Sequence, residues 1–230
     1  MARRLNLTVM TLGFLRRPAL ACSAAALLAS ANVAAAGVRQ HVASGIAFSV
    51  SAGKIDFGKN LVLSGTIPTH AAGQQVELLN QACGFTEPVT LATVRTGAGG
   101  KFHFTLQPML KTQYTARWNE RTSGGRTIGV RPQVTLAKLS GNRYLVSASV
   151  GGGQFFTGKP ALLQRRAGSR WVTVASTTLK QASDDTALVA VSSGTVAASV
   201  ARGSTVRAAI AQSAVGSCYL PSTSAPLVLP

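Results

Sequence analysis

The sequence predicts an all-β protein in which an N-terminal leader precedes two tandem antiparallel β-sandwiches. Short runs that alternate apolar and polar residues, rich in Val and Thr, are separated by Gly and polar turns along most of the chain. Such alternation is typical of half-buried strands. No convincing helical periodicity appears after residue 37, and the order of strands and turns occurs twice. Together, these three observations predict an all-β fold with two similar halves.

The composition limits the classes of protein that the chain can belong to. Its 230 residues include 23 Lys and Arg but only 6 Asp and Glu, a formal net charge of +17. With 46% hydrophobic and 13% charged residues, the chain is too apolar to be disordered. The length allows one large domain or two of about 100 residues, each able to bury a core. So few carboxylates disfavour acid–base catalysis and binding of hard metals.

The N-terminal segment has the pattern of a secretory signal peptide. Charge in the first 38 residues comes from arginines alone, and 21 uncharged residues follow Arg17. This run ends in small residues at 34–37, which predicts a helical leader at 1–36 that is cleaved after Ala36. A retained membrane anchor is the alternative, because 21 residues can just span a bilayer. The run is only modestly hydrophobic, which favours cleavage and no membrane span in the mature chain.

Seven strands are expected in the first domain, which covers residues 37–134. Their predicted positions are 46–50, 61–63, 76–79, 89–94, 101–106, 113–118 and 128–136. The glycine-rich segment GAGG at 97–100 lies between two of these runs and predicts a hairpin connection, because Gly adopts positive φ freely. Seven short, evenly spaced strands within about 90 residues are typical of a β-sandwich.

The second domain, residues 135–230, repeats this order of strands and turns. Residues 61–67, 76–79, 89–92, 114–118 and 131–134 match 144–150, 161–164, 172–175, 206–210 and 225–228, respectively. Gly73 and Gly158 occupy corresponding turns before the third strand. No linker rich in Pro or Ser separates the two halves, so we expect one strand to run into the next near 133–139.

Several of these motifs resemble a known family. The stretch 96–118, with TGAGGKFHFT and TQYTARW, looks like bacterial Ig-like repeat domains from secreted and surface proteins of high-GC Gram-positive bacteria. Residues 162–166 and 170–174 resemble the same family, although Ala161 stands where a larger β-branched residue is usual. The resemblance implies two Ig-like β-sandwiches outside the membrane that serve as spacer, scaffold or binding module. It implies no catalytic residues and no cofactor.

Two cysteines remain once Cys22 is removed with the leader. Successive loops of an antiparallel sandwich alternate between its two ends. Cys83 lies in the loop after the third strand of the first domain, and Cys218 lies in the loop before the last strand of the second. This count places both at the junction, so we expect a Cys83–Cys218 disulfide in an exported protein. Two exposed thiols or an intermolecular bridge are the alternatives.

Few other side chains suggest chemistry, and the sequence indicates no catalytic or metal-binding residues. The three histidines lack ligand spacing, and His103 is expected on the solvent face of a strand. The pair Asp184 and Asp185 is interpreted as a solvated turn rather than a cation site. Trp118 and Trp171 fall within strand patterns, which favours packing over a carbohydrate-binding platform.

Positive charge is the remaining functional signal. Arg165, Arg166 and Arg170 form the densest basic cluster of the mature chain, around a tight turn, and a second basic stretch covers 111–131. A basic surface outside the membrane attracts wall polymers, anionic lipid or nucleic acid. No aromatic residues interleave with the basic ones, which argues against specific nucleic-acid binding. The alternative is that this charge serves solubility alone.

These observations predict a secreted, extracellular, non-enzymatic protein with a structural or adhesive role at the cell envelope or in the medium. The second hypothesis is an accessory module that binds anionic wall polymer or carbohydrate through Arg165, Arg166 and Arg170. A cell-wall polymer or a surface protein is the expected partner. An enzyme would require a hidden group of carboxylates or histidines. The oligomeric state is left open.

Overall fold

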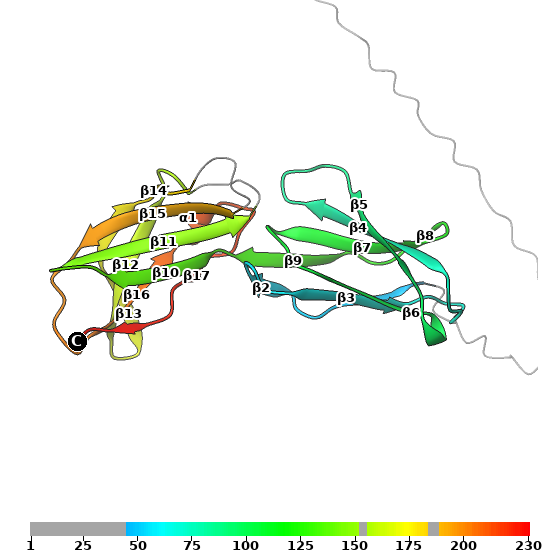
Figure 1. Ribbon diagram of the computed structural model, residues 1–230, viewed down its shortest axis with the longest axis horizontal. Coiled ribbons are helices and arrows are strands. Elements are labelled where there is room, and N and C mark those ends of the chain that lie inside the picture. Colours follow the sequence, from blue (N-terminus) through cyan, green and yellow to red (C-terminus); the bar gives the residue numbers. More distant parts are fainter. Residues whose placement is uncertain (1–44, 152–155, 184–188) are drawn as a thin grey trace, which may run out of the picture. The chain divides into compact units, whose positions relative to one another are not determined.

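The computed structural model describes residues 45–151, 156–183 and 189–230 (Figure 1). This part of the chain is all-β, as predicted, and its strands form four sheets. Pairing between strands is antiparallel throughout these residues except for one short parallel pair, β2–β9. The predicted leader at 1–36, His41 and the pair Asp184 and Asp185 lie outside the described residues.

Two sheets enclose the first core. Their elements are β1 (Ala47–Val50), β2 (Lys54–Asp56), β3 (Leu61–Thr66), β4 (Gln75–Ala82), β5 (Val89–Arg95), the 3-10 turn η1 (Ala98–Gly100), β6 (Lys101–Leu106), β7 (Thr112–Trp118), β8 (Arg121–Thr122) and β9 (Arg126–Arg131). One sheet has the order β1-β3-β6, and the other has the order β2-β9-β7-β4-β5 with β8 paired to β7. Side chains buried between them include those of Leu61, Leu63, Leu78, Tyr114 and Ile128.

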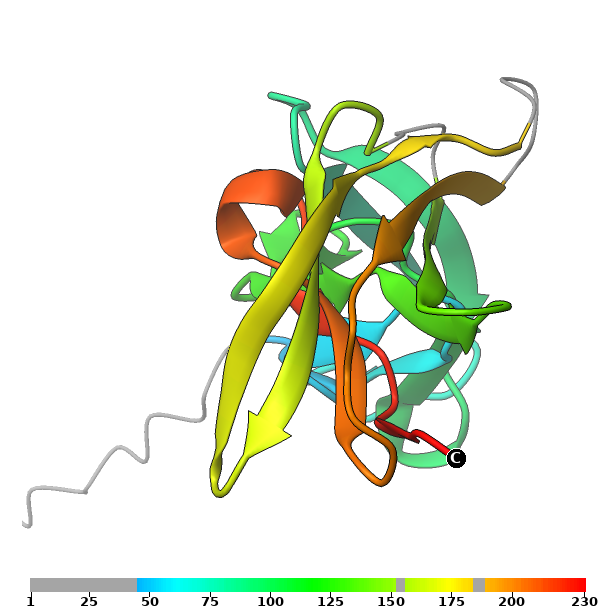
Figure 2. The same cartoon turned by 90° about the vertical axis from the view of Figure 1, so that its left-hand side faces the viewer.

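A second pair of sheets encloses a separate core. Its elements are β10 (Gln133–Lys138), β11 (Arg143–Gly151), β12 (Pro160–Ala167), β13 (Arg170–Thr178), β14 (Lys180–Gln181), β15 (Val189–Ala197), β16 (Thr205–Ile210), α1 (Gln212–Val215), β17 (Ser222–Thr223) and β18 (Leu227–Val228). The sheet orders are β10-β11-β15-β14 and β13-β12-β16-β17, with β18 also paired to β16. Figure 2 shows the β12–β13 hairpin in yellow beside β16 in orange.

Period-two alternation explains why these segments form strands. Along β7, for example, Thr112, Tyr114, Ala116 and Trp118 are buried, whereas Gln113 and Arg117 are exposed. Alternate side chains of a strand point to opposite faces, so every second residue enters the core. Burial of each large apolar side chain stabilises the fold by about 1.5–3 kcal/mol relative to exposure.

Three features differ from the expectations. The run 128–136 is not one strand: it breaks at Pro132, which has no N–H to donate to a ladder, into β9 and β10 of different sheets. The segment GAGG at 97–100 does not close a hairpin, because β5 pairs with β4 and β6 pairs with β3. This turn carries the chain from one sheet to the other, with Gly99 and Gly100 at φ of 68° and 69°. The three-residue strand β2 was too short to be predicted.

Positions that correspond between the two halves in the sequence also have matching local geometry in the structure. Gly73 and Gly158 precede β4 and β12 with φ of 78° and 77°. The N–H of Gly73 donates to the carbonyl of Thr96, and that of Gly158 donates to the carbonyl of Leu179. The β4–β5 pair has a register shift between residues 78 and 79, and the β12–β13 pair has one between 163 and 164.

Candidate functional site

The predicted disulfide is present. Cys83, just after β4, is bonded to Cys218, which follows α1 and lies 135 residues further along the chain. Backbone hydrogen bonds join the same segments: the N–H of Cys83 donates to the carbonyl of Lys111 (2.8 Å), and the N–H of Lys111 donates to the carbonyl of Cys218 (2.9 Å). The loops that carry both cysteines therefore meet next to the end of the β6–β7 connection.

The residues after Cys218 hold the two halves together. The N–H of Leu220 donates to the carbonyl of Val130 (2.8 Å), and Ser222 Oγ donates to the carbonyl of Pro132 (2.7 Å). Tyr219 is buried in the second core, and its hydroxyl donates to the carbonyl of Gly151 in β11 of the same half (3.1 Å). Burial raises the pKa of Tyr219 to about 12. The segment 219–222 thus contacts strands from both sides of the junction.

Apolar contacts close the junction as well. Leu110, from the first half, packs against the second core. Gly151 faces Met109 and Phe57 so closely that a Cβ atom on it would lie 2.8 Å from Met109 Cγ and 2.9 Å from Phe57 Cε2. Contacts this close indicate direct packing between the halves, in addition to the disulfide.

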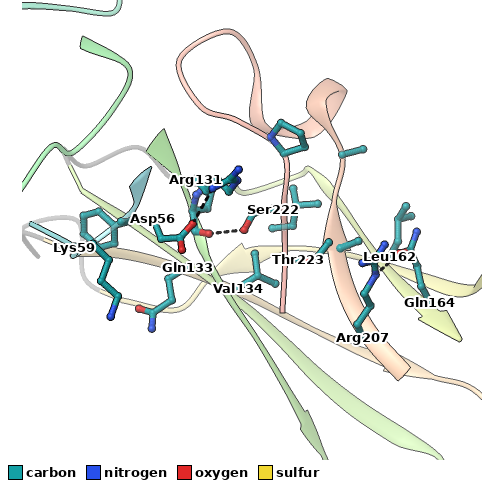
Figure 3. Close-up of a pocket in the computed structure, with 16 residues that line it drawn as sticks. Asp56, Lys59, Arg131, Gln133, Val134, Leu162, Gln164, Arg207, Ser222 and Thr223 are labelled. Atoms are coloured by element: carbon teal, nitrogen blue, oxygen red, sulfur yellow. Dashed lines mark hydrogen bonds and ion pairs between the residues drawn. The ribbon is translucent and has the colours of Figure 1, made fainter. Parts of the chain in front are cut away.

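A groove of about 630 Å³ opens beside this junction (Figure 3). One wall comes from the region around β2 and β9. The other is the outer face of β12, β16 and β17, where Leu162 and Arg207 alternate with the buried residues Leu163 and Ala208. Its charged lining residues are Asp56, Lys59, Arg131 and Arg207.

Both arginines that line the groove are held by neighbouring side chains. Arg131 Nη1 lies 3.4 Å from Asp56 Oδ1, in an ion pair between the parallel strands β9 and β2. Arg207 Nε donates to Gln164 Oε1 (2.9 Å), and the guanidinium lies over the ring of Trp171, 4.2 Å from its centroid. Partial burial lowers the pKa of the Arg207 guanidinium from its ordinary value.

The predicted basic cluster lies outside this groove. Arg165 and Arg166 are at the end of β12 and Arg170 begins β13, so all three are exposed around the tip of one hairpin. Arg166 Nε donates to the carbonyl of Gly168 (3.1 Å), which has φ of 61° in the turn. The three residues are brought together, as the sequence indicated, and none of them lines the groove, although Arg166 pairs with Trp171, the ring beneath Arg207.

Some arginines of the second basic stretch, 111–131, make contacts within the first sandwich. Arg117 forms an ion pair with Glu77 on the neighbouring strand β4. Arg126 Nε donates to the carbonyl of Phe48 (3.3 Å). These arginines therefore stabilise strand contacts, and exposed ion pairs of this type contribute about 0–1 kcal/mol each.

The remaining candidates have ordinary structural surroundings. His103 is exposed on β6, as predicted, and His70 Nδ1 lies 3.3 Å from the carbonyl oxygen of Gly99. Trp118 is buried, whereas Trp171 is half-buried beneath Arg207. Within the described ranges, no three His, Cys, Asp or Glu residues gather closely enough to hold a metal ion. The helical segments of these ranges are also too short or too polar to cross a membrane.

Sequence reasoning missed the groove because its residues are distant in the chain. Gln164 faces Arg207 only because β12 and β16 pair in that register. The fold and its junction define an all-β protein with two cores joined by one disulfide. In comparisons with known proteins, no protein-family model and no curated protein matches this chain.

Proposed function

We propose that this chain is an exported, non-enzymatic protein of two tandem Ig-like β-sandwiches, with a structural or adhesive role at the cell envelope or in the medium. The Cys83–Cys218 disulfide carries the proposal. Disulfides form and persist in oxidising compartments and are rare in the cytosol. The leader pattern at 1–36 and the resemblance to surface repeat domains support the same location.

The junction supports a structural role. Domains of one chain commonly move relative to each other unless their interface is large and apolar. Here a disulfide, the hydrogen bond from the N–H of Leu220 to the carbonyl of Val130 and the packing of Leu110 all resist such motion. A pair of sandwiches fixed in this way suits a scaffold that holds other components at a constant distance.

The placement of the carboxylates supports a non-enzymatic role. Glu77 and Asp56 each face an arginine on a neighbouring strand, so charge pairing within the sheet accounts for both. General acid–base catalysis instead needs a group aimed at a bound substrate.

Expression of the full chain in a Gram-positive host tests the export proposal. We expect the protein in the wall fraction or the medium, with Gly37 as its first residue and Cys83 linked to Cys218 in non-reducing peptide maps. A matched chain without residues 1–36 should stay in the cytosol. Recovery of the full chain from the cytosol, with its leader attached and both thiols free, would contradict the proposal.

A second candidate function is binding of anionic wall polymer. The exposure of Arg165, Arg166 and Arg170 around one hairpin tip favours it, because such a cluster attracts polyanions in a salt-dependent manner. Isolated cell walls should retain the protein at low salt and release it at high salt. Replacement of the three arginines by Gln should weaken retention. Failure to bind walls at low salt would exclude this function.

A further inference from the structure

We propose that the groove beside the junction, lined by Lys59, Arg131 and Arg207, binds a linear anionic glycan. The proposal deepens the second candidate function, on which its ligand class rests, and assigns the binding to residues other than the hairpin arginines. Binding of such a glycan requires three properties of the groove: positive charge, hydrogen-bond donors held in place, and surfaces that suit sugar rings.

The groove has an excess of positive charge. Lys59, Arg131 and Arg207 line it together with a single carboxylate, Asp56. Asp56 pairs with Arg131, while Lys59 and Arg207 have no ion-pair partner in the ranges 45–151, 156–183 and 189–230. A hollow surface lined by charge of one sign raises the local concentration of oppositely charged ligands. The unbalanced cations therefore favour an anion.

Arg207 is held in a fixed position before any ligand arrives. Its Nε donates to Gln164 Oε1, and its guanidinium carbon lies over the Trp171 ring. Neither Nη atom has a hydrogen-bond partner among the residues that the structure describes. A guanidinium that presents both Nη groups can bind a carboxylate or phosphate through two parallel hydrogen bonds. Because the side chain is already ordered, binding loses little further conformational entropy.

The rest of the lining suits sugar rings better than a bare polyanion. Phe57, Leu162 and Pro221, which are half-buried or exposed, contribute apolar surface between the charged residues. Gln133 and Thr223, both exposed, supply groups that can exchange hydrogen bonds with hydroxyls. A sugar ring presents C–H faces and hydroxyl edges, so a charged glycan matches both parts of this surface. Figure 3 shows the labelled lining residues spread along the groove, with Lys59 and Gln133 toward one end and Gln164 and Arg207 toward the other.

Titration calorimetry of the purified, disulfide-bonded protein tests the proposal. The probe is an oligogalacturonate of about six sugars at low salt, with a neutral maltooligosaccharide of equal length and inorganic polyphosphate as comparisons. We expect the oligogalacturonate to bind, the neutral sugar to give no measurable heat, and polyphosphate to bind more weakly. Loss of binding at high salt is expected for a charged contact.

Variants then locate the site. Arg207→Gln and Lys59→Gln should each raise the Kd by about tenfold, as expected for the loss of one charged hydrogen bond. Thr223→Phe keeps every charge but fills the groove, and it should also raise the Kd. Lys59 and Thr223 are exposed, so their variants remain informative if Arg207→Gln perturbs folding. Circular dichroism and the intact disulfide serve as folding controls.

The matched control is the triple variant Lys101→Gln, Lys180→Gln, Arg202→Gln, whose exposed residues do not line the groove and which should change the Kd by less than about twofold. If replacement of Arg165, Arg166 and Arg170 by Gln abolishes binding and the groove variants do not, the groove proposal is overturned and wall binding through the hairpin stands. Absence of oligogalacturonate binding at low salt also overturns it. Polyphosphate that binds as tightly as the oligogalacturonate overturns the choice of a glycan. The export proposal is tested separately by the location and first residue of the protein.

Discussion

Leu220 lies directly against Gly129. A Cβ atom on Gly129 would come within 2.6 Å of Leu220 Cδ1 and 3.0 Å of its Cγ, although the two residues belong to different halves of the chain. Gly129 is buried in β9, and Leu220 follows the disulfide-bonded Cys218. Glycine at position 129 therefore allows the segment after the disulfide to approach the first sandwich.

Gly129→Val should destabilise the protein by about 1–3 kcal/mol, because the added methyl groups overpack this contact. Urea unfolding measures the loss. The matched control is the double variant Gly129→Val with Leu220→Ala, in which the smaller side chain makes room for the valine. The double variant should lose less unfolding free energy than the sum of the losses in Gly129→Val and Leu220→Ala alone. Strict additivity would show that the two positions do not contact each other.

Removal of the disulfide by Cys83→Ser together with Cys218→Ser should lower the free energy of unfolding by about 5 kcal/mol. The chain-entropy model gives this value for a closed loop of 135 residues. Guanidinium unfolding with and without reductant provides the measurement. Reductant should destabilise the native protein by a similar amount and leave the double variant unchanged. Equal stability of the native protein and the double variant would contradict a stabilising role for the disulfide.

Gly65→Ala should lower the free energy of unfolding by about 2–3 kcal/mol. Gly65 pairs with Phe102 across β3 and β6, and a Cβ atom there would lie 2.3 Å from the Ala47 carbonyl oxygen and 2.4 Å from Phe102 Cζ. The backbone oxygen cannot move aside as a flexible side chain can. Gly53→Ala is the control, because a Cβ atom at Gly53 meets nothing within 4 Å. Thermal unfolding that gives equal losses for both variants would disprove this steric account.

Alkaline pH should unfold the protein partly through Tyr219. Burial raises its pKa in the folded state to about 12, above the ordinary 10.0. The resulting stabilisation is fully present below about pH 10 and is lost as pH rises toward 12, because the unfolded chain releases the proton first. We expect this residue to account for about 2 kcal/mol of the loss, after allowance for solvent screening.

The Tyr219→Phe variant isolates that contribution. It should show a smaller loss of unfolding free energy between pH 9 and 12 than the unmodified protein. Near pH 7 it should be less stable by about 1 kcal/mol, because the hydrogen bond to the Gly151 carbonyl is gone. Tyr114 and Tyr144 also have pKa values raised by burial, so the variant keeps some alkaline sensitivity. Identical pH profiles would contradict the assignment.

Local patterns predicted most of the strands, because period-two alternation depends on neighbouring residues alone. The buried positions of β7 follow directly from its sequence. The Cys83–Cys218 pairing was also accessible, since loops of an antiparallel sandwich alternate between its ends. The connection at 97–100 was misassigned because glycines permit a turn without specifying which strands it joins. The contact of Arg207 with Trp171 depends on the placement of two distant strands, which no local pattern contains.

The separation of the two cysteines has a consequence for biogenesis. Cys83 is synthesised 135 residues before its partner, so its thiol must stay reduced and unpaired while the second sandwich is made. During that interval the first sandwich lacks the contacts that Leu220 and Ser222 provide to β9 and Pro132. Oxidation is therefore a late step, and a thiol on one newly made chain can reach another chain before it reaches Cys218. Conditions that crowd nascent molecules should divert the pathway toward disulfide-linked dimers.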